Sequence, residues 1–339
     1  MQKITINDVA KHAGVSKKTV SRVLNDEPNV SETTKLKVRA IFEELGYRPS
    51  PQARGLATNQ SYLIGLMYDN PNKSYVSDVQ TGALEICDQK GYHLLIRPCE
   101  YESNSLLTDV ANLLTNSRLD GLVLTPPFSD MYSLIEMLDQ KQLPYVRIAP
   151  TIMTSHSPCV ISNDIDAAFE MTRHLISLGH SKIGFIKGHP DHNVSEQRLV
   201  GYQRALAQSG ILFAPELVQQ GYFTFSSGED SARKLLALPA PPSAIFASND
   251  YMAAGVLKVA AQKNISVPHE LSVAGFDNAP ISSYIWPSLT TVKQPVRDMA
   301  SQALRMLIET IRDTRLENNE LYLKDELILR NSTAPIRIV

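Results

Sequence analysis

The sequence predicts a small all-α domain of the helix-turn-helix type, followed by a two-lobed α/β domain built on doubly wound parallel sheets. The chain of 339 residues is long enough to need more than one hydrophobic core. Its first 46 residues contain short helical patterns around a glycine, which is typical of a helix-turn-helix. From residue 62 onward, short apolar runs alternate with amphipathic segments, which indicates βαβ units and parallel sheets.

The composition is that of a soluble globular protein. Hydrophobic residues make up 43% and charged residues 20% of the chain, and no run of about 18 apolar residues could span a membrane. The N-terminus lacks the apolar core of a signal peptide. Cys87, Cys99 and Cys159 are too few and too widely spaced for a disulfide framework or a zinc site. We therefore expect a cytoplasmic protein that contains no metal and no cofactor.

Charge is distributed unevenly along the chain. The first sixty residues contain ten Lys or Arg and six Asp or Glu, a formal charge of +4, whereas the remainder contains 23 and 29, a charge of −6. A basic N-terminal segment joined to an acidic body is typical of a nucleic-acid reader attached to a domain that does not bind nucleic acid.

The first two helices are predicted from their caps. Thr5 and Asp8 have the spacing of a capping box, which marks the start of a helix. Gly14 ends that helix, and Ser16 is a suitable cap for a second one over residues 17–24. Two short helices around a glycine-containing turn predict a helix-turn-helix.

The second helix has two chemically distinct sides when its residues are placed at about 100° intervals. The polar arc consists of Lys17, Lys18, Ser21 and Arg22. The apolar arc consists of Val20, Val23 and Leu24. The polar arc is suited to the major groove of DNA, where Arg22 can make a bidentate contact with guanine. A solvated surface that binds nothing is the alternative interpretation.

A third helix and a linker complete the N-terminal part. Ser31 is the expected cap of this helix, and Gly46 its expected end. Its apolar stripe is predicted to be Leu36, Val38, Ile41, Phe42 and Leu45. In residues 47–60, Pro49 and Pro51 predict an extended stretch and then a short helix, or else a flexible linker.

The body is predicted to hold parallel strands joined by helices. The expected strands are Leu63–Met67, Leu94–Ile96, Leu122–Leu124, Tyr145–Ile148, Ile183–Ile186, Ala244–Phe246 and Leu271–Ala274. In such sheets, ligands bind beyond the carboxyl ends of the strands. No glycine-rich dinucleotide motif or P-loop follows any of these runs, so nucleotide binding is disfavoured. The pair His189 and His192 lies in a loop without a third ligand motif, and we expect no metal there.

Several motifs closely resemble those of the lactose-repressor (LacI/GalR) family over almost the whole chain. In the first sixty residues they are Asp8-Val9-Ala10, Ala13-Gly14-Val15-Ser16, Thr19-Val20-Ser21-Arg22-Val23-Leu24-Asn25, Leu45-Gly46-Tyr47-Arg48-Pro49 and Ala53-Arg54-Gly55-Leu56. In the body they include Arg198-Leu199-Val200-Gly201-Tyr202, Ser248-Asn249-Asp250, Gly275-Phe276-Asp277 and Leu289-Thr290-Thr291-Val292-Lys293-Gln294-Pro295.

For the N-terminal part, this resemblance implies specific contacts with DNA. The base-reading positions are Lys17, Lys18 and Arg22. The phosphate-contacting positions are Ser16, Thr19, Ser21 and Asn25. The minor-groove positions are Ala53, Arg54 and Leu56, on a hinge helix that orders on DNA, with Leu56 as a wedge at the operator centre.

For the body, the resemblance implies a periplasmic-binding-protein-like domain whose chain crosses between two lobes three times. The segment around Leu289–Pro295 is expected to be the last crossing. The expected effector contacts are Tyr75, Arg198, Phe223, Asn249, Asp277 and Trp286. A carboxylate, an amide and a guanidinium that face one another can bind the hydroxyl groups of a sugar selectively.

Other roles are open for several of these residues. Asp250 is either a ligand contact or the cap of the next helix, Asp277 a turn residue, and Arg198 a partner in an ordinary salt bridge. Tyr284 is expected in the core. Relatives commonly carry an acid at the end of the strand Tyr145–Ile148, where this chain has Arg147, so the ligand contact from the first lobe is expected to differ.

Together these features predict three parts: a DNA-binding domain over 1–46, a hinge over 47–60, and an effector-binding and dimerisation domain over 61–339. The chain is expected to bind a palindromic operator in double-stranded DNA as a homodimer, and to regulate carbohydrate utilisation under the control of a mono- or oligosaccharide. It is not expected to be an enzyme. The alternatives are a sugar-binding receptor or transport protein without a DNA role, and a co-repressor-type regulator of purine or other metabolism.

Overall fold

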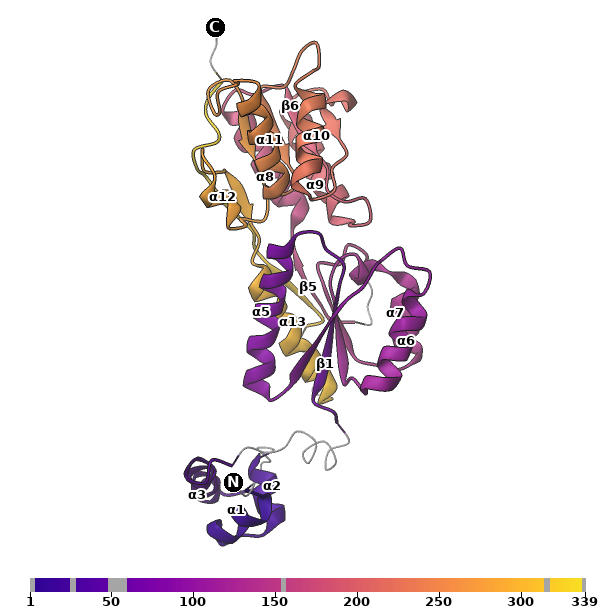
Figure 1. Cartoon of the computed structure of the whole chain (residues 1–339), viewed down its shortest axis with the longest axis vertical. Coiled ribbons are helices and arrows are strands. Elements are labelled where there is room, and N and C mark those ends of the chain that lie inside the picture. Colours follow the sequence, from indigo (N-terminus) through magenta and orange to yellow (C-terminus); the bar gives the residue numbers. More distant parts are fainter. Residues whose placement is uncertain (1–3, 25–28, 48–59, 154–156, 314–317, 337–339) are drawn as a thin grey trace. The chain divides into compact units, whose positions relative to one another are not determined.

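The computed structural model describes residues 4–24, 29–47, 60–153, 157–313 and 318–336. The chain forms two compact units, Met1–Tyr62 and Leu63–Val339, which we describe separately (Figure 1). Within the described residues, no helix combines the length and apolar character needed to cross a membrane.

The N-terminal unit is a three-helix domain around a small apolar core. Its helices are α1 (Ile6–Ala13), α2 (Lys17–Leu24) and α3 (Glu32–Glu44). The buried residues are Val9, Ala10, Ala13, Val20, Val23 and Val38. Gly14 between the first two helices has a left-handed backbone with φ of 63°, which glycine adopts without steric cost. The predicted helix-turn-helix is confirmed.

Side chains at the helix starts hold the short helices in place. The backbone N–H and the hydroxyl of Thr5 both donate to the carboxylate of Asp8, at 2.8 and 2.7 Å. The Ser16 hydroxyl accepts the N–H of Thr19 at 3.1 Å, so Ser16 is the predicted cap of α2. Each such cap contributes about 1 kcal/mol, which matters for helices of eight residues.

The predicted apolar stripe of α3 was wrong at one position. Leu36 is 66% exposed, whereas Val38 is fully buried. Two residues that are two apart in a helix point about 200° from each other. Leu36 therefore cannot share the buried side with Val38, and it faces solvent.

The first lobe of the second unit, here the N-lobe, is a six-stranded parallel sheet with helices on both faces. Its strands are β1 (Leu63–Tyr68), β2 (His93–Pro98), β3 (Gly121–Leu124), β4 (Tyr145–Ile148), β5 (Cys159–Ser162) and β11 (Glu320–Leu323), in the order β11-β5-β4-β3-β1-β2. Its helices are α5 (Lys73–Lys90), α6 (Leu106–Ser117), the 3-10 helix η1 (Phe128–Asp130), α7 (Tyr132–Gln140) and α13 (Val296–Ile311). Helices α5 and α13 cover one face, and α6 and α7 cover the other (Figure 1).

The second lobe, here the C-lobe, is built on a four-stranded parallel sheet. Its strands are β6 (Ile183–Ile186), β7 (Val218–Gln219), β8 (Ala244–Ala247) and β9 (Ser272–Ala274), in the order β7-β6-β8-β9. Its helices are α8 (Asp164–Ser177), α9 (Val194–Gln208), η2 (Pro215–Leu217), α10 (Phe225–Leu235), α11 (Asp250–Gln262) and α12 (Ile281–Tyr284). An antiparallel pair, β10 (Thr291–Lys293) and β12 (Glu326–Ile328), lies beside this sheet. Helices α8 and α9 pack on one face and α10 and α11 on the other.

The chain crosses between the two lobes three times, as the resemblance implies. The first crossing joins β5 to α8, the second joins β10 to α13, and the third joins β11 to β12. The expectation that Leu289–Pro295 forms the last crossing was wrong, because this segment forms the second. After α13 the chain adds β11 to the N-lobe sheet beside β5, and then returns to pair β12 with β10.

Candidate nucleic-acid interface and effector pocket

Helix α2 has the two-sided character that its sequence predicts. Val20 and Val23 are buried, at 0% and 3% exposure, and hold the helix against its neighbours. Lys17 and Lys18 are exposed on the other side, and Arg22 is half-buried. A helix held by its apolar face and presenting cations on its opposite face has the chemistry of a major-groove reader.

Of the four residues expected to contact phosphate, three lie within the described residues. Ser16 is exposed, and Thr19 and Ser21 are half-buried. The hydroxyls of Ser16 and Thr19 lie 2.9 Å apart and hydrogen-bond each other. Asn25 and the hinge residues Ala53, Arg54 and Leu56 lie outside the described residues, so their expected DNA contacts stay predictions.

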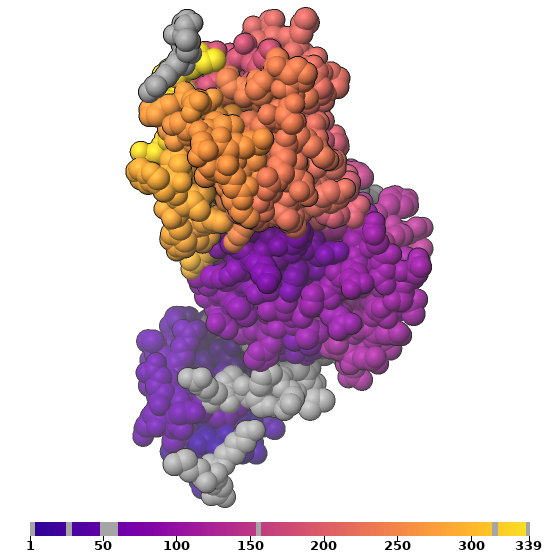
Figure 2. Space-filling model, turned by 45° about the horizontal axis from the view of Figure 1, so that its top comes forward, coloured from indigo at the N-terminus to yellow at the C-terminus, as the bar shows by residue number. Residues whose placement is uncertain are grey.

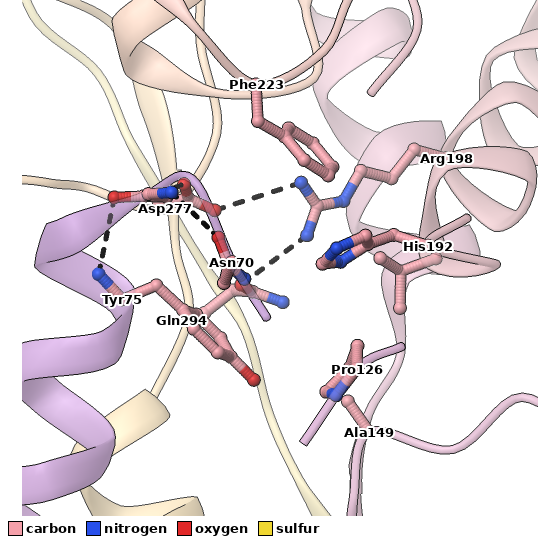
Figure 3. A pocket seen from close by; sticks show the side chains of 11 residues that line it. Asn70, Tyr75, Pro126, Ala149, His192, Arg198, Phe223, Asp277 and Gln294 are labelled. Atoms are coloured by element: carbon pink, nitrogen blue, oxygen red, sulfur yellow. Dashed lines mark hydrogen bonds and ion pairs between the residues drawn. The ribbon is translucent and has the colours of Figure 1, made fainter. Parts of the chain in front are cut away.

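A pocket lies between the two lobes of the second unit, at the carboxyl ends of the strands. Four of the six residues expected to contact an effector line it: Tyr75, Arg198, Phe223 and Asp277. The remaining lining residues are Asn70, Asn72, Pro126, Ala149, His192, Val194 and Gln294. Figure 3 shows Arg198 directed toward Asp277 and Gln294, with the ring of Phe223 beside the guanidinium. We call this cavity of about 30 Å³ the inner pocket.

Arg198 is the only permanently positive side chain among the described residues that line the inner pocket. Its Nε donates to Asp164 Oδ1 at 2.7 Å, and its Nη1 lies 3.8 Å from Asp277 Oδ1. The carbonyl of Ser248 also accepts from Nη1, and the guanidinium stacks 3.7 Å from the centre of the Phe276 ring. The guanidinium is thus oriented by partners on several elements before any ligand binds.

Asp277 faces Arg198 across the inner pocket. The side-chain amide of Asn72 donates to its Oδ2 at 2.6 Å. Burial raises the pKa of Asp277 to about 7, against the opposing effect of Arg198. Asp277 therefore exchanges its proton near neutral pH, and a ligand hydroxyl that donates to it stabilises the ionised form.

Hydrogen bonds across the cleft hold the two lobes together in this closed state. Asn72, the N-cap of α5 in the N-lobe, donates to Asp277 of the C-lobe. Beside it, the hydroxyls of Ser74 and Tyr251 lie 3.1 Å apart. We call these two contacts the interlobe latch. Figure 2 shows the surfaces of the two lobes meeting with little open space between them.

The backbone at the inner pocket is under local strain. Ala149, Phe223 and Asp277 all have positive φ, of 47°, 59° and 100°, although none is glycine. Such conformations cost of order 1 kcal/mol or more each and often occur at functional sites. The Phe223 ring also requires a glycine at position 188, because a Cβ there would lie 2.1 Å from the ring. The strained conformations therefore occur at residues that line the inner pocket.

Two expected effector contacts do not line the inner pocket. Asn249 is the N-cap of α11: its Oδ1 accepts from the N–H of Met252 and its Nδ2 donates to the carbonyl of Phe223, both at 2.9 Å. Asn249 therefore positions Phe223 instead of reaching the cavity. Trp286 is 85% exposed and is not among the lining residues. The structure therefore does not bring these two residues to the inner pocket, and their expected effector contacts stay predictions.

Two further expectations near the site are resolved by the structure. Asp250 is fully buried and accepts from the N–H of Ala279 and the hydroxyl of Thr291, so it holds the Asp277 loop and is not the helix cap. Tyr284 was expected in the core but is 82% exposed. It ends the short helix α12, whose buried side is occupied by Ser282.

Arg147, at the position where the resemblance implies an acid, does not line the inner pocket. It is fully buried, with its Nε donating to Ser157 at 2.8 Å and its Nη1 to the carbonyls of Ile152 and Ser129. The chain after β4 lines the pocket through Ala149, whose side chain has no polar group. The N-lobe contact therefore differs as expected: the segment after β4 offers a ligand no polar side chain.

Several lining residues were not predicted, chiefly Asn72, His192 and Gln294. Asn72 lies shortly after β1, so it could have been predicted from the rule that ligands bind beyond the carboxyl ends of parallel strands. His192 lies in the loop before α9, together with His189. Within the described residues, no group of three metal-ligating side chains occurs.

Comparisons with known proteins agree with this arrangement. Residues 5–50 match the family described as bacterial regulatory proteins, lacI family, and residues 172–333 match a periplasmic binding protein-like domain. The HTH-type transcriptional repressor PurR of Photobacterium profundum is 33% identical over 330 residues, which cover 97% of this chain and 98% of that protein.

Two solved structures are similar over nearly the whole chain. The complex of the transcriptional regulator CelR with cellobiose has a TM-score of 0.75 at 27% identity, covering 97% of this chain and 99% of that one. The lac repressor dimer bound to operator and the anti-inducer ONPF has a TM-score of 0.77 at 28% identity, covering 98% and 100%. Fold and similarity define a DNA-binding transcription regulator. The chain belongs to the lacI family of bacterial regulatory proteins.

We expect His192→Gln to reduce the pH dependence of the free energy of unfolding in acid. Burial lowers the pKa of His192 to about 3, whereas an unfolded histidine titrates near about 6.5. Below the latter pH the unfolded chain binds a proton that the folded chain excludes, so the wild-type free energy of unfolding falls as pH decreases. Urea denaturation from about pH 7 to pH 4 should show a difference of up to about 1.4 kcal/mol per pH unit. Parallel curves for both proteins would contradict a buried neutral imidazole.

Proposed function

We propose that this protein regulates a carbohydrate-utilisation operon as a homodimeric repressor that binds a palindromic operator and responds to a sugar-like effector. The observation that carries the proposal is the inner pocket, where Arg198, Asp277 and Phe223 converge between two lobes of a chain that begins with a DNA-reading fold. A bacterial cytoplasmic location is part of the proposal, because operator DNA lies there.

The chemistry of α2 supports operator reading. Lys17 and Lys18 at its N-terminal end and Arg22 one turn further can meet base edges. The hydroxyls of Ser16, Thr19 and Ser21 are the proposed contacts to the DNA backbone. Asn25, with Ala53, Arg54 and Leu56 at the minor groove, completes the proposed contact set. A twofold arrangement of two such helices matches a palindromic site.

The chemistry of the inner pocket supports a sugar. Arg198 donates, Asp277 accepts, and the amides of Asn72 and Gln294 can do both, which suits the paired donor and acceptor character of hydroxyl groups. The rings of Phe223 and Tyr75 offer apolar surface to a sugar ring. CelR, a structural relative, is described as a complex with cellobiose.

An exposed apolar surface on the C-lobe supports a homodimer. Tyr284, Trp286 and Leu329 are 82%, 85% and 59% exposed, and solvent-exposed apolar groups of this size in one region are typical of interfaces. Hydrogen bonds between Ser288 and Asn331 hold the segments of Trp286 and Leu329 next to each other. In this proposal Trp286 contacts the second copy of the chain and does not contact the effector.

The interlobe latch supports control by the effector. A ligand that bonds Asp277 competes with Asn72 for the same carboxylate, so binding changes the contact that holds the lobes closed. Any movement between the lobes in one copy alters the spacing of two paired readers. Coupling between two such sites is typically about 1–3 kcal/mol.

Arg22→Ala is expected to weaken operator binding by about 1–3 kcal/mol and to relax the preference at one base pair in each half-site. Affinities for the operator, for single-base variants of it and for a scrambled duplex, measured at one salt concentration by fluorescence anisotropy, test this. An equal loss on operator and scrambled duplex would show that Arg22 contacts phosphate only.

Asp277→Ala is expected to abolish the response of operator binding to sugars while leaving operator affinity in their absence nearly unchanged. In the wild type, sugar affinity should fall as pH drops below about 7, because a protonated Asp277 has lost its charge and accepts a hydroxyl hydrogen bond more weakly than the carboxylate does. Asp166→Ala, an exposed carboxylate outside the pocket, is the matched control. A preserved sugar response in Asp277→Ala would remove this residue from the site.

Trp286→Ala is expected to weaken the dimer by about 2 kcal/mol or more, the loss typical of a central interface tryptophan. Sedimentation equilibrium over a range of protein concentrations measures the change. Leu212→Ala removes an apolar side chain that is 91% exposed elsewhere on the C-lobe and should have no effect. Unchanged association in Trp286→Ala would place the interface on another surface.

A further inference from the structure

A second cavity adjoins the inner pocket at the mouth of the cleft. It has a volume of about 290 Å³, and we call it the outer chamber. Asn70 and His192 line both cavities, so the two are neighbours that share a wall. The outer chamber also carries Tyr222, His189 and Asp191, none of which the pocket described above uses.

Four rings form a continuous wall from the outer chamber to the inner pocket. Tyr222 lies 5.6 Å from His189, His189 lies 5.6 Å from His192, and His192 lies 5.5 Å from Phe223, all between ring centres and all edge to face. The outermost ring, Tyr222, is 46% exposed and has apolar surface left for a ligand. Exposed aromatic side chains in a concave site are suited to the apolar faces of ring-shaped ligands.

The sizes of the two cavities differ by about tenfold. The inner pocket of about 30 Å³ has room for only one or two water molecules while the latch is closed. The outer chamber is close to about 300 Å³, the lower end of cavities that hold small ligands. A ring can therefore occupy the outer chamber in the closed state, whereas entry into the inner pocket requires the latch to open.

The charges around the two cavities disfavour an anionic ligand. Asp69 and Asp191 line the outer chamber and Asp277 the inner pocket, whereas Arg198 is the only permanent cation among the described lining residues. The Arg198 guanidinium already bonds Asp164 and the Ser248 carbonyl. A phosphate would meet carboxylates without a cation to balance it, while hydroxyl groups can donate to the same carboxylates.

We propose that the effector is an uncharged glycoside of at least two rings, with one sugar in the inner pocket and the next ring against Tyr222 and His189 in the outer chamber. The two-ring ligand rests on the proposed function of a sugar-responsive regulator. It adds to that function the minimum length of the ligand and its lack of charge. Tyr222 is then a specificity residue for the second ring, and it does not touch the first.

Calorimetric titration of the full chain with matched pairs of ligands tests this. The pairs are methyl β-glucoside with cellobiose, methyl α-glucoside with maltose, methyl β-galactoside with lactose, and methyl α-galactoside with melibiose. In each pair the first ring and its linkage are the same, so only the second ring differs. One disaccharide should bind about tenfold more tightly than its partner, and glucose 6-phosphate should bind no more tightly than methyl glucoside.

The variant Tyr222→Ala should weaken that disaccharide by roughly 3- to 10-fold, the range expected for one aromatic contact, and leave the methyl glycoside within about twofold. Tyr222→Phe keeps the ring and should retain the disaccharide affinity. Tyr132→Ala, which removes a tyrosine that is 75% exposed on the N-lobe, should change neither ligand.

Four results would overturn the proposal, and they separate it from the proposed function. Equal affinity within every pair, or equal weakening of both ligands by Tyr222→Ala, would refute the second-ring site but keep a sugar effector. Tightest binding by the sugar phosphate would refute an uncharged ligand. Failure of all eight neutral sugars to bind would refute the carbohydrate effector itself, and the outer chamber as a sugar site with it.

Discussion

The two-lobed unit depends on one buried charge, the guanidinium of Arg198. A charge with 5% of its side chain exposed is tolerated only when partners surround it, and here Asp164, the Ser248 carbonyl and the Phe276 ring do so. Asp164 begins α8 directly after the first crossing, and Ser248 follows β8. The Arg198 side chain therefore contacts the first crossing between the lobes through Asp164 and the end of β8 through Ser248, and it also lines the inner pocket. Removing it would leave Asp164 buried without its counter-charge.

The pocket arises from the topology more than from any single motif. Parallel strands in both lobes end on the same cleft, so the segments that follow β1, β3, β4, β6, β7 and β9 all line it. Strained backbone at Ala149, Phe223 and Asp277 then aims particular groups inward. Asn249 and Asp250 are buried supports of this arrangement, because they bond the backbone of the Phe223 and Asp277 loops.

The DNA-reading unit follows a simpler rule, since almost all of its structure is local. Caps at Thr5, Ser16 and Ser31 and a left-handed glycine place three helices within the first 47 residues. The buried valines of α2 face the other helices, which leaves its lysines outside. A short amphipathic helix with good caps can be recognised from its spacing, because its few neighbours lie close in the sequence.

The sequence alone determined the helix-turn-helix, the two α/β lobes, seven of the strands and the inward-facing Arg198, Phe223 and Asp277. These follow from periodicity, from caps and from motifs with a known fold. It did not reveal the strands β5, β7, β10, β11 and β12. The pairing of β11 with β5 and of β12 with β10 joins segments that lie far apart in the sequence. Only the tertiary structure decided that Asn249 supports Phe223, that Trp286 faces solvent, and that Asn72 meets Asp277 from 205 residues away. Hydrogen bonds between segments that are remote in the sequence depend on the tertiary arrangement of those segments, and a local sequence pattern contains no information about that arrangement.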